Sequence, residues 1–334
     1  MKKILLIGTG GTIASRKTPD GLQPGLQIQA LLDHVPEVKA FCTVDAQEPF
    51  SIDSTNLQPT HWLKLVACIR AQYEAYDGFV ICHGTDTMAY TAAALSYLIR
   101  DPDKPVVLTG AQKPIEHPET DARVNLLDSF RWACMGYGGV CIVFGGHVLA
   151  GTRARKVRTR SARAFASLDF PELAVTRGER LIPFFPKPQT CGPAFYETLD
   201  PHVAVLKLTP GLPPESFAAF GERCDGLVVE SYGTGGIPAV YEEALAQLCA
   251  AGKTIVVGTQ VPHEGSDLSV YQVGRSVLRK YNLLETADMT VEAAVTKLMW
   301  VLGQTRDPAE IRHLFQTEIN HDRLIRPGGC ATRS

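Results

Sequence analysis

Two short segments rich in glycine and hydroxyl side chains each follow an apolar run of the kind expected for a buried strand. The first extends over residues 8–15 and contains Thr12, and the second is His83-Gly84-Thr85-Asp86-Thr87. A threonine hydroxyl can act as a nucleophile, but at neutral pH it needs a neighbouring base or proton-relaying group. The carboxyl ends of parallel strands meet at one edge of a sheet, where ligands bind. Thr12 and Thr85 are therefore candidates for a pair of catalytic hydroxyls.

Lys156 is the candidate base for these threonines. It lies in the segment Gly151–Arg163, which carries six basic residues and is predicted to be a long loop. Burial or cationic neighbours favour the neutral form of a lysine, and only that form accepts a proton. Arg153, Arg155 and Arg158 are such neighbours. A solvated basic face or an anion-binding patch would explain the same charges without catalysis.

Both threonine segments also have purely structural interpretations. Thr12 can hydrogen-bond a tight turn, and Thr85 and Asp86 can cap a following helix. The glycine spacing of the first segment also suggests a dinucleotide-binding loop. However, Ile13 occupies the place of the third glycine, and the charged segment Arg16–Asp20 that follows is predicted to be an exposed loop instead of a helix. The sequence therefore argues against a nucleotide site.

The elements that must position these residues follow an α/β pattern. Short apolar runs without polar alternation are typical of strands buried on both faces. They are Lys3–Ile7, Gly78–Cys82, Pro105–Thr109, Val140–Phe144, Val203–Leu208, Gly226–Glu230 and Lys253–Gly258. Helical stretches are expected at Thr60–Tyr76, Thr87–Arg100 and Asp121–Met135, and a last helix capped by Asp307. This alternation predicts a mainly parallel, doubly wound sheet.

A chain of 334 residues is expected to form two domains. The segment Pro183–Pro201 holds five prolines, a composition that favours an ordered linker over a helix. We expect a larger N-terminal domain over residues 1–185, which carries both threonine segments. A linker over residues 186–202 and a smaller C-terminal α/β domain over residues 203–334 are expected to follow.

Composition excludes several classes of partner. The 33 basic and 35 acidic residues leave a formal net charge of −2, which argues against a general nucleic-acid binder. No apolar run approaches the roughly 20 residues that span a bilayer. The apolar run near the N-terminus is too short to be the hydrophobic region of a signal peptide. The nine cysteines form no CxxC pair, so neither disulfides nor a zinc site is expected. We expect a cytoplasmic protein without a metal or other cofactor.

Several motifs together resemble those of the bacterial-type L-asparaginases, most closely the cytoplasmic type I branch. The most specific are Gly10-Gly11-Thr12-Ile13-Ala14, His83-Gly84-Thr85-Asp86-Thr87-Met88 and Thr109-Gly110-Ala111-Gln112-Lys113-Pro114. Further matches are Asp53-Ser54-Thr55, the Lys156 loop, Ser231-Tyr232-Gly233-Thr234-Gly235 and Ala287-Asp288-Met289-Thr290-Val291-Glu292. The matches follow the family's order over nearly the whole chain. The resemblance implies hydrolysis of the side-chain amide of asparagine to aspartate and ammonia, with minor glutaminase activity and no cofactor.

The resemblance also implies a role for each catalytic residue. Thr12 is expected to be the nucleophile that forms a covalent acyl-enzyme. Thr85, Asp86 and Lys156 are expected to form a second essential cluster, in which Lys156 is the base. Thr85 would relay the proton or activate water, and Asp86 would fix Lys156. The backbone amide of Thr85 and the neighbourhood of Ala111 would stabilise the oxyanion.

Substrate binding and assembly follow from the same resemblance. In the segment Asp53-Ser54-Thr55, Ser54 and Thr55 are expected to hold the α-carboxylate of asparagine, while Asp86 pairs with its α-amine. Members of the family build each site between the N-terminal domain of one subunit and the C-terminal domain of its neighbour. A homodimer, often paired into a tetramer, is therefore expected. Tyr232 and Gly233 are the candidates for the neighbour's contribution.

The chain departs from the family pattern at several positions. Many members carry a tyrosine on the lid after the first threonine, where this chain has Leu22. Either Tyr232 or Tyr271 of a neighbouring subunit supplies that hydroxyl, or the nucleophile is activated differently. Glu230 and Val261 replace residues that bind a regulatory asparagine in some members, so allosteric activation is not expected.

Two other functions stay open at this point. The missing lid tyrosine is compatible with a protein that binds or senses a small amino acid without turning it over. An asparaginase-like subunit of a tRNA-dependent amidotransferase would use the ammonia elsewhere. Such subunits usually carry an extra N-terminal domain, whereas the catalytic domain is expected to start at residue 1 here. Ammonia release from free asparagine would separate these functions.

Overall fold

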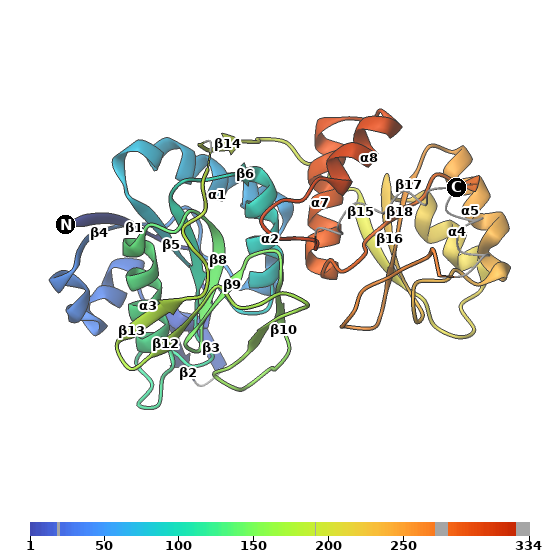
Figure 1. Ribbon diagram of the computed structural model, residues 1–334. Helices are drawn as coiled ribbons and strands as arrows, with labels where there is room; N and C mark the ends of the chain where they lie inside the picture. The colour runs from blue at the N-terminus through green and yellow to red at the C-terminus, as the bar shows by residue number, and fades with distance from the viewer. Residues whose placement is uncertain (19–20, 191, 271–279, 325–334) are drawn as a thin grey trace.

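The computed structural model describes residues 1–18, 21–190, 192–270 and 280–324. A large sheet lies at the centre of the N-terminal part, with described strands in the order β13-β12-β9-β8-β7-β5-β1-β4 (Figure 1). Its parallel strands are β1 (Lys2–Gly8), β4 (Cys42–Gln47), β5 (Gly78–Cys82), β7 (Pro105–Thr109) and β8 (Gly139–Phe144). The antiparallel strands β9 (His147–Ala150), β12 (Ala174–Arg177) and β13 (Arg180–Pro183) extend one edge.

Helices cover both faces of this sheet, as the apolar runs predict. Alternate residues of β1 belong to two different core clusters: Leu5 packs with α1 (Pro59–Gln72) and α2 (Met88–Leu98), and Leu6 packs with α3 (Ala122–Met135). Side chains on successive strand residues point to opposite faces, so a strand covered on both sides must be apolar throughout. The predicted doubly wound sheet is therefore confirmed.

A second, smaller sheet follows in the C-terminal part. Its described strands β15 (Val203–Lys207), β16 (Gly226–Ser231), β17 (Thr254–Thr259) and β18 (Leu284–Glu285) are parallel and adjacent in that order. Helices α4 (Pro214–Glu222) and α5 (Glu242–Ala250) pack on one face, and α7 (Val291–Gln304) and α8 (Pro308–Gln316) follow the last strand. The Asp307 side chain caps α8, as predicted, by accepting bonds from two backbone amides.

The two sheets share one apolar core through α7. Its residues Leu298 and Trp300 belong to the same core cluster as Tyr97 of α2, and the Tyr97 and Trp300 rings stack with centroids 6.1 Å apart. Figure 1 shows α7 between the two sheets, beside α2. Helix α2 is thus packed against the C-terminal part of the chain.

Two segments predicted as loops contain strands instead. The charged stretch after Thr12 forms a hairpin of β2 (Ser15–Thr18) and β3 (Gly21–Pro24). Within the basic segment, β10 (Ala154–Lys156) pairs with β11 (Phe165–Ser167). The loop predictions were wrong because charged side chains do not prevent strand pairing when the backbone bonds are satisfied by a neighbouring strand.

Short elements complete the described fold. They are η1 (Thr12–Ala14), η2 (Ile28–His34), η3 (Pro36–Ala40), η4 (Ser54–Asn56), η5 (Tyr73–Ala75), η6 (Ala239–Tyr241), β6 (Ile99–Arg100) and β14 (Ala194–Phe195). β14 pairs with β6, so part of the proline-rich segment is ordered against the N-terminal sheet's helices. None of the described helices has the length and apolar character needed to cross a membrane.

Candidate active site

Glycines bring the segments that follow β1 and β5 into direct contact. A Cβ on Gly11 would lie 2.6 Å from the backbone nitrogen of Gly84, and one on Gly84 would lie 2.5 Å from Ser54 Oγ. Gly11 also has φ +87, a conformation that residues with side chains rarely adopt. Thr12 and Thr85 each follow one of these touching glycines. The two threonine segments therefore meet, as their positions after parallel strands predicted.

Backbone hydrogen bonds hold the same strand ends together. The Thr9 amide donates to the Cys82 carbonyl (3.1 Å), and the Ile52 amide donates to the Thr9 carbonyl (3.0 Å). The Thr87 hydroxyl reaches across to the Ser54 carbonyl (2.9 Å). These bonds fix the backbone around Thr12, Ser54 and Thr85 before any substrate is bound.

A buried polar chain orients the peptide that precedes Thr85. His83 is 1% exposed, and burial lowers the pKa of its imidazole to about 4. Nδ1 lies 2.7 Å from the Gly84 carbonyl, so a neutral ring carries its proton there. Nε2 then accepts from the Thr91 hydroxyl (2.9 Å), which itself accepts from Trp62 Nε1 (3.0 Å). Because carbonyl and amide point in opposite directions across a trans peptide, the Thr85 amide is directed away from His83.

Lys156 joins the second threonine segment. Its Nζ donates to Thr85 Oγ1 (2.7 Å) and to Asp86 Oδ1 (2.6 Å). The Lys156 side chain is 17% exposed, whereas that of Asp86 is 57% exposed. The helix-capping alternative for Asp86 is wrong, since no side chain caps α2 and this carboxylate contacts Lys156. The cluster can pass a proton between an amine and a hydroxyl beside an accessible carboxylate.

Two of the arginines near Lys156 are neutralised by acids of the C-terminal part. Arg153 pairs with Asp288 (2.7 Å), and Arg155 lies 3.7 Å from Glu292. The expectation of uncompensated positive charge beside Lys156 was therefore wrong for Arg153 and Arg155, whereas Arg158 donates to the Arg163 carbonyl (3.1 Å). The segment is also not simply a solvated basic face, because the Arg153 side chain is 0% exposed.

Thr12 lies half-buried at the start of η1. Its hydroxyl forms no hydrogen bond within residues 1–18, 21–190, 192–270 and 280–324, so the turn-stabilising alternative has no support there. The turn is closed instead by Ser15, whose hydroxyl donates to the Gly11 carbonyl (3.0 Å). An unengaged hydroxyl at the meeting point of the two loops is available to a ligand.

The matches to known families cover both parts of the chain. Residues 3–187 match the model of the asparaginase N-terminal domain, and residues 202–315 match that of the glutaminase/asparaginase C-terminal domain. The chain belongs to the asparaginase family. The resemblance in the sequence motifs is thereby confirmed, and the chain is a member of a family of amidohydrolases.

Individual relatives of this asparaginase-family chain agree with that assignment. An L-asparaginase of Thermococcus kodakarensis is 40% identical over 95% of this chain and 98% of its own length. The solved structure of the thermostable L-asparaginase from that organism superposes with a TM-score of 0.90, covering 96% of this chain and 98% of that one, at 38% identity. L-asparaginase I of Vibrio cholerae gives a TM-score of 0.85 at 27% identity, covering 97% and 99% of the two chains. One of the subunits of the glutamyl-tRNA(Gln) amidotransferase from Pyrococcus horikoshii is 33% identical over 94% of this chain and 75% of its own length.

The segment predicted to bind the substrate carboxylate borders the two threonine loops. Asp53 Oδ1 accepts from the amide and the hydroxyl of Thr55, both at 2.9 Å, and so caps η4. Ser54 is 4% exposed and its Oγ lies against Gly84. Ala111, on the segment after β7, is 1% exposed. A Cβ on its neighbour Gly110 would lie 2.3 Å from the His83 carbonyl, so this loop also reaches the site.

Tyr232 and Gly233 belong to the C-terminal part of the chain. They follow β16 at the carboxyl edge of the C-terminal sheet, where the Gly233 carbonyl accepts from the Thr259 hydroxyl (2.5 Å). Tyr232 is 37% exposed. Neither residue forms a hydrogen bond or ion pair with Thr12 or Lys156 in the described part of the chain. Tyr271 lies outside the described residues, and the side chain of Leu22 is not described.

One acidic cluster has the composition of a metal site but is occupied by an arginine. Ligand atoms of Asp200, His202 and Asp225 lie within 4.8 Å of one another. Arg306 Nη2 lies 2.5 Å from Asp200 and 3.5 Å from Asp225 and so supplies the positive charge. We assign no metal to these residues.

Sequence reasoning missed the residues that support the site from behind. His83 was singled out only as part of a motif, and its partners Thr91 and Trp62 were assigned to helices without a polar role. Arg153 was interpreted as a neighbour of Lys156, although its side chain contacts Asp288. A histidine directly after a buried strand was the available signal for the polar chain of His83, Thr91 and Trp62. No local signal in the sequence pointed to the contact between Arg153 and Asp288.

Proposed function

We propose that the chain hydrolyses L-asparagine to L-aspartate and ammonia through a threonine acyl-enzyme. The observation that carries this proposal is the contact of Lys156 Nζ with Thr85 Oγ1 (2.7 Å) and Asp86 Oδ1 (2.6 Å). The loop of Thr85 meets the loop of Thr12 at Gly84 and Gly11, and the Thr12 hydroxyl has no hydrogen bond among the described residues. The names of the Thermococcus and Vibrio relatives support asparagine as the substrate. Weaker hydrolysis of glutamine belongs to the same proposal.

The proposed reaction has two steps. In the first, Thr12 Oγ bonds to the side-chain amide carbon of asparagine, its proton passes to the amide nitrogen, and ammonia leaves an aspartyl ester. In the second, Lys156 in its neutral amine form takes a proton from water through Thr85, and the water oxygen adds to the ester carbon. The ester bond breaks, Thr12 recovers its proton and aspartate leaves. Covalent catalysis of this kind replaces one difficult hydrolysis by two easier steps.

The groups around the site match a zwitterionic substrate. Asp86 Oδ2 has no partner in the described structure, and this exposed carboxylate is proposed to bind the α-ammonium group. Ser54 Oγ also lacks a partner among the described residues and, with Thr55, is proposed to bind the α-carboxylate. The Thr85 amide, directed away from His83, is proposed to donate to the oxyanion. One such donor contributes about 3 kcal/mol to transition-state stability.

Assembly and location are further parts of the proposal. We propose a homodimer or tetramer in which Tyr232 and Gly233 complete the site of a neighbouring subunit. Neither residue bonds to Lys156 or Thr12 among the described residues, which is consistent with this arrangement. The N-terminal domain is proposed to end at residue 185 and the linker to extend over residues 186–202. A structural relative from Campylobacter jejuni, with a TM-score of 0.81 at 26% identity, is described as a probable cytoplasmic L-asparaginase, which supports a cytoplasmic location.

Ammonia release by the purified chain tests the proposed reaction. We expect release from asparagine that falls by at least two orders of magnitude in Thr12→Ala, Thr85→Val and Lys156→Met. Thr43→Val is a matched control, because Thr43 is exposed and its hydroxyl bonds to the Lys2 carbonyl alone among the described residues. Undiminished activity in Thr12→Ala or Thr85→Val would refute the two-threonine mechanism.

The relation to the amidotransferase of Pyrococcus favours one alternative, in which ammonia is passed on to an aminoacyl-tRNA. The same assay distinguishes it, since a protein of that kind would need its partner and tRNA for full ammonia release. A binding or sensing protein would instead retain bound asparagine without releasing ammonia. Rapid release by the chain alone, unchanged on addition of tRNA, would exclude both alternatives.

A further inference from the structure

The end of the described chain returns to the N-terminal sheet. After α8, residues 317–324 form a segment that we call the C-terminal turn. Asn320 Nδ2 donates to Ser96 Oγ (2.8 Å) and to the Val140 carbonyl (2.9 Å), which belong to α2 and β8. Asn320 and His321 both have positive φ, at 49 and 65 degrees. Asparagine and histidine tolerate this conformation better than most residues, and here it lets the chain reverse against the sheet.

A buried ion pair fixes the C-terminal turn to α7. Lys297 Nζ lies 2.6 Å from Asp322 Oδ2, and both side chains are 0% exposed. The same carboxylate oxygen accepts from the Tyr97 hydroxyl of α2 (3.0 Å), and Oδ1 accepts from the Ile319 amide (3.0 Å). Asp322 is therefore paired and hydrogen-bonded on both oxygens, as a buried charge must be. Its bonds hold the turn, α7 and α2 in one arrangement.

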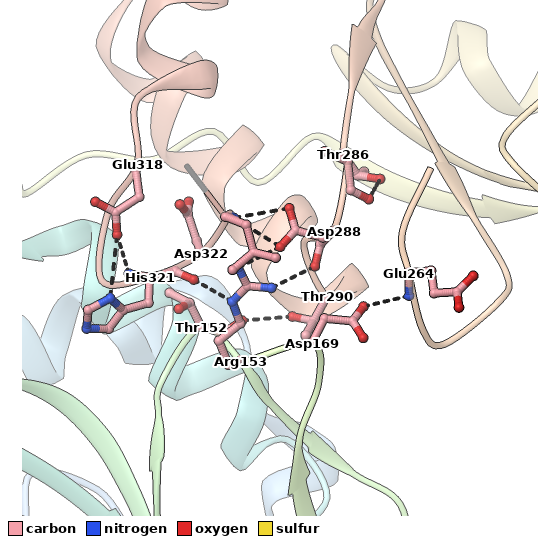
Figure 2. A network of polar contacts seen from close by, with 12 residues as sticks. Thr152, Arg153, Asp169, Glu264, Thr286, Asp288, Thr290, Glu318, His321 and Asp322 are labelled. Atoms are coloured by element: carbon pink, nitrogen blue, oxygen red, sulfur yellow. Dashed lines mark hydrogen bonds and ion pairs between the residues drawn. The ribbon is translucent and has the colours of Figure 1, made fainter. Parts of the chain in front are cut away.

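Arg153 is the contact between this turn and the segment that carries Lys156. Figure 2 shows its guanidinium between Asp288 and the C-terminal turn. Nη2 donates to Asp288 Oδ2 (2.7 Å), Nη1 donates to the Asp288 carbonyl (2.9 Å), and Nε donates to the His321 carbonyl. The guanidinium also lies 5.6 Å from the centre of the Phe170 ring. Its bonds thus fix three separate stretches of the chain.

Thr152 adds two contacts to the junction, by which we mean the place where Arg153 meets Asp288 and the C-terminal turn. Its carbonyl accepts from the Thr290 hydroxyl (3.1 Å), and its own hydroxyl donates to the Asn320 carbonyl (2.5 Å). Arg153 closes the base of the β10–β11 hairpin, since its carbonyl accepts from the Leu168 amide (3.0 Å). Lys156 is the third residue beyond it, about 10 Å along an extended strand. The position of the hairpin base therefore determines where β10 presents the lysine.

Burying an arginine for stability alone is costly, because a buried ion pair contributes little more than a well-packed apolar residue. What the planar guanidinium provides is fixed geometry, as it satisfies three acceptors in set directions. We propose that Arg153 is a positioning residue, which through Asp288 and the C-terminal turn holds β10 so that Lys156 reaches Thr85. This inference rests on the proposed asparagine hydrolysis. Arg153 touches no substrate and acts only through Lys156.

Steady-state kinetics on the full chain test this positioning role. In Arg153→Lys the charge is kept but the three-way contact is lost, and we expect kcat to fall about 10- to 100-fold with KM within about twofold. Asp288→Asn provides a second test if Arg153→Lys fails to fold. Phe217→Leu is the control for stability: Phe217 is a fully buried residue of α4 in the core cluster of the C-terminal sheet, which holds no residue of the hairpin, of α7 or of the C-terminal turn. All variants are assayed at a temperature where circular dichroism shows them folded.

The outcomes separate the two proposals. A fall in kcat at constant KM in Arg153→Lys, with kcat preserved in Phe217→Leu at a comparable loss of melting temperature, supports the positioning role. Equal kcat values in wild type and Arg153→Lys overturn it, and so does an equal fall in both variants or a rise in KM alone. If the wild-type chain releases no ammonia from asparagine, the proposed function itself has failed.

Discussion

Acid should destabilise the fold through His83. The imidazole is buried, with Nδ1 bonded to the Gly84 carbonyl and Nε2 to Thr91. Burial lowers its pKa from 6.5 to about 4, although the bond to the Gly84 carbonyl acts in the opposite direction. In the unfolded chain the same imidazole takes up a proton near pH 6.5. Between pH 6.5 and 4 the unfolded state therefore binds more protons, and acidification favours unfolding.

The size of this effect follows from the two pKa values. They differ by about 2.5 units, and each unit corresponds to about 1.36 kcal/mol, so His83 contributes a loss of about 3 kcal/mol. The stability is fully present above pH 6.5, falls as the pH drops toward 4, and changes no further below that. A loss of this size is a large fraction of the roughly 5–15 kcal/mol by which typical proteins are stable.

Comparison with His83→Gln isolates the contribution of this side chain. Glutamine can donate to the Gly84 carbonyl but does not titrate, whereas the carboxylates titrate alike in both proteins. We would measure the free energy of unfolding by urea titration at pH 7.5, 5.5 and 4.0, at one protein concentration so that assembly contributes equally. The stability advantage of wild type over His83→Gln should shrink by about 3 kcal/mol from pH 7.5 to 4.0. A constant difference across these pH values would refute the assignment of a buried neutral imidazole.

Two further predictions concern packing around the site and the buried ion pair. A methyl group in Gly84→Ala would lie 2.5 Å from Ser54 Oγ. We therefore expect kcat/KM for asparagine to fall at least about tenfold. An unchanged kcat/KM would show that Ser54 does not contribute to binding. Lys297→Met leaves Asp322 buried without its cation, and the free energy of unfolding measured in urea should fall by about 3–5 kcal/mol. The double variant with Asp322→Leu should recover much of this loss, and equal losses in the single and double variants would contradict the explanation.

The central strands of the fold could be predicted closely because they are covered on both faces. Gly78–Cys82 and Pro105–Thr109 have the predicted bounds, since every residue in them is buried. Strand β4 went unpredicted because it lies at the edge of the sheet, where most of its residues are exposed or half-exposed. The hairpin strand β10 was hidden by its charges. Local pattern thus indicates strands only where burial dictates the residue types.

The residues of the candidate site could be named from the motifs, but their support could not. The order of strands explains why the loops after β1 and β5 meet, since these strands are direct neighbours. The partner of Arg153 is 135 residues distant in the sequence, and the charge of Arg153 alone favoured a role beside Lys156. Which acid neutralises an arginine depends on how the two sheets pack through α7. That packing is a property of the whole fold and leaves no trace in the basic segment.

Trapping the covalent intermediate tests the proposed mechanism most directly. Thr85→Val, in which removal of the ester by water should be slowed, would be mixed with asparagine, quenched in acid and digested for mass spectrometry. We predict a peptide containing Thr12 that is heavier by one aspartyl group, and no such peptide from the double variant Thr12→Ala/Thr85→Val. An aspartyl group on any other residue, or none in wild-type enzyme and Thr85→Val quenched during rapid turnover, would contradict Thr12 as the nucleophile.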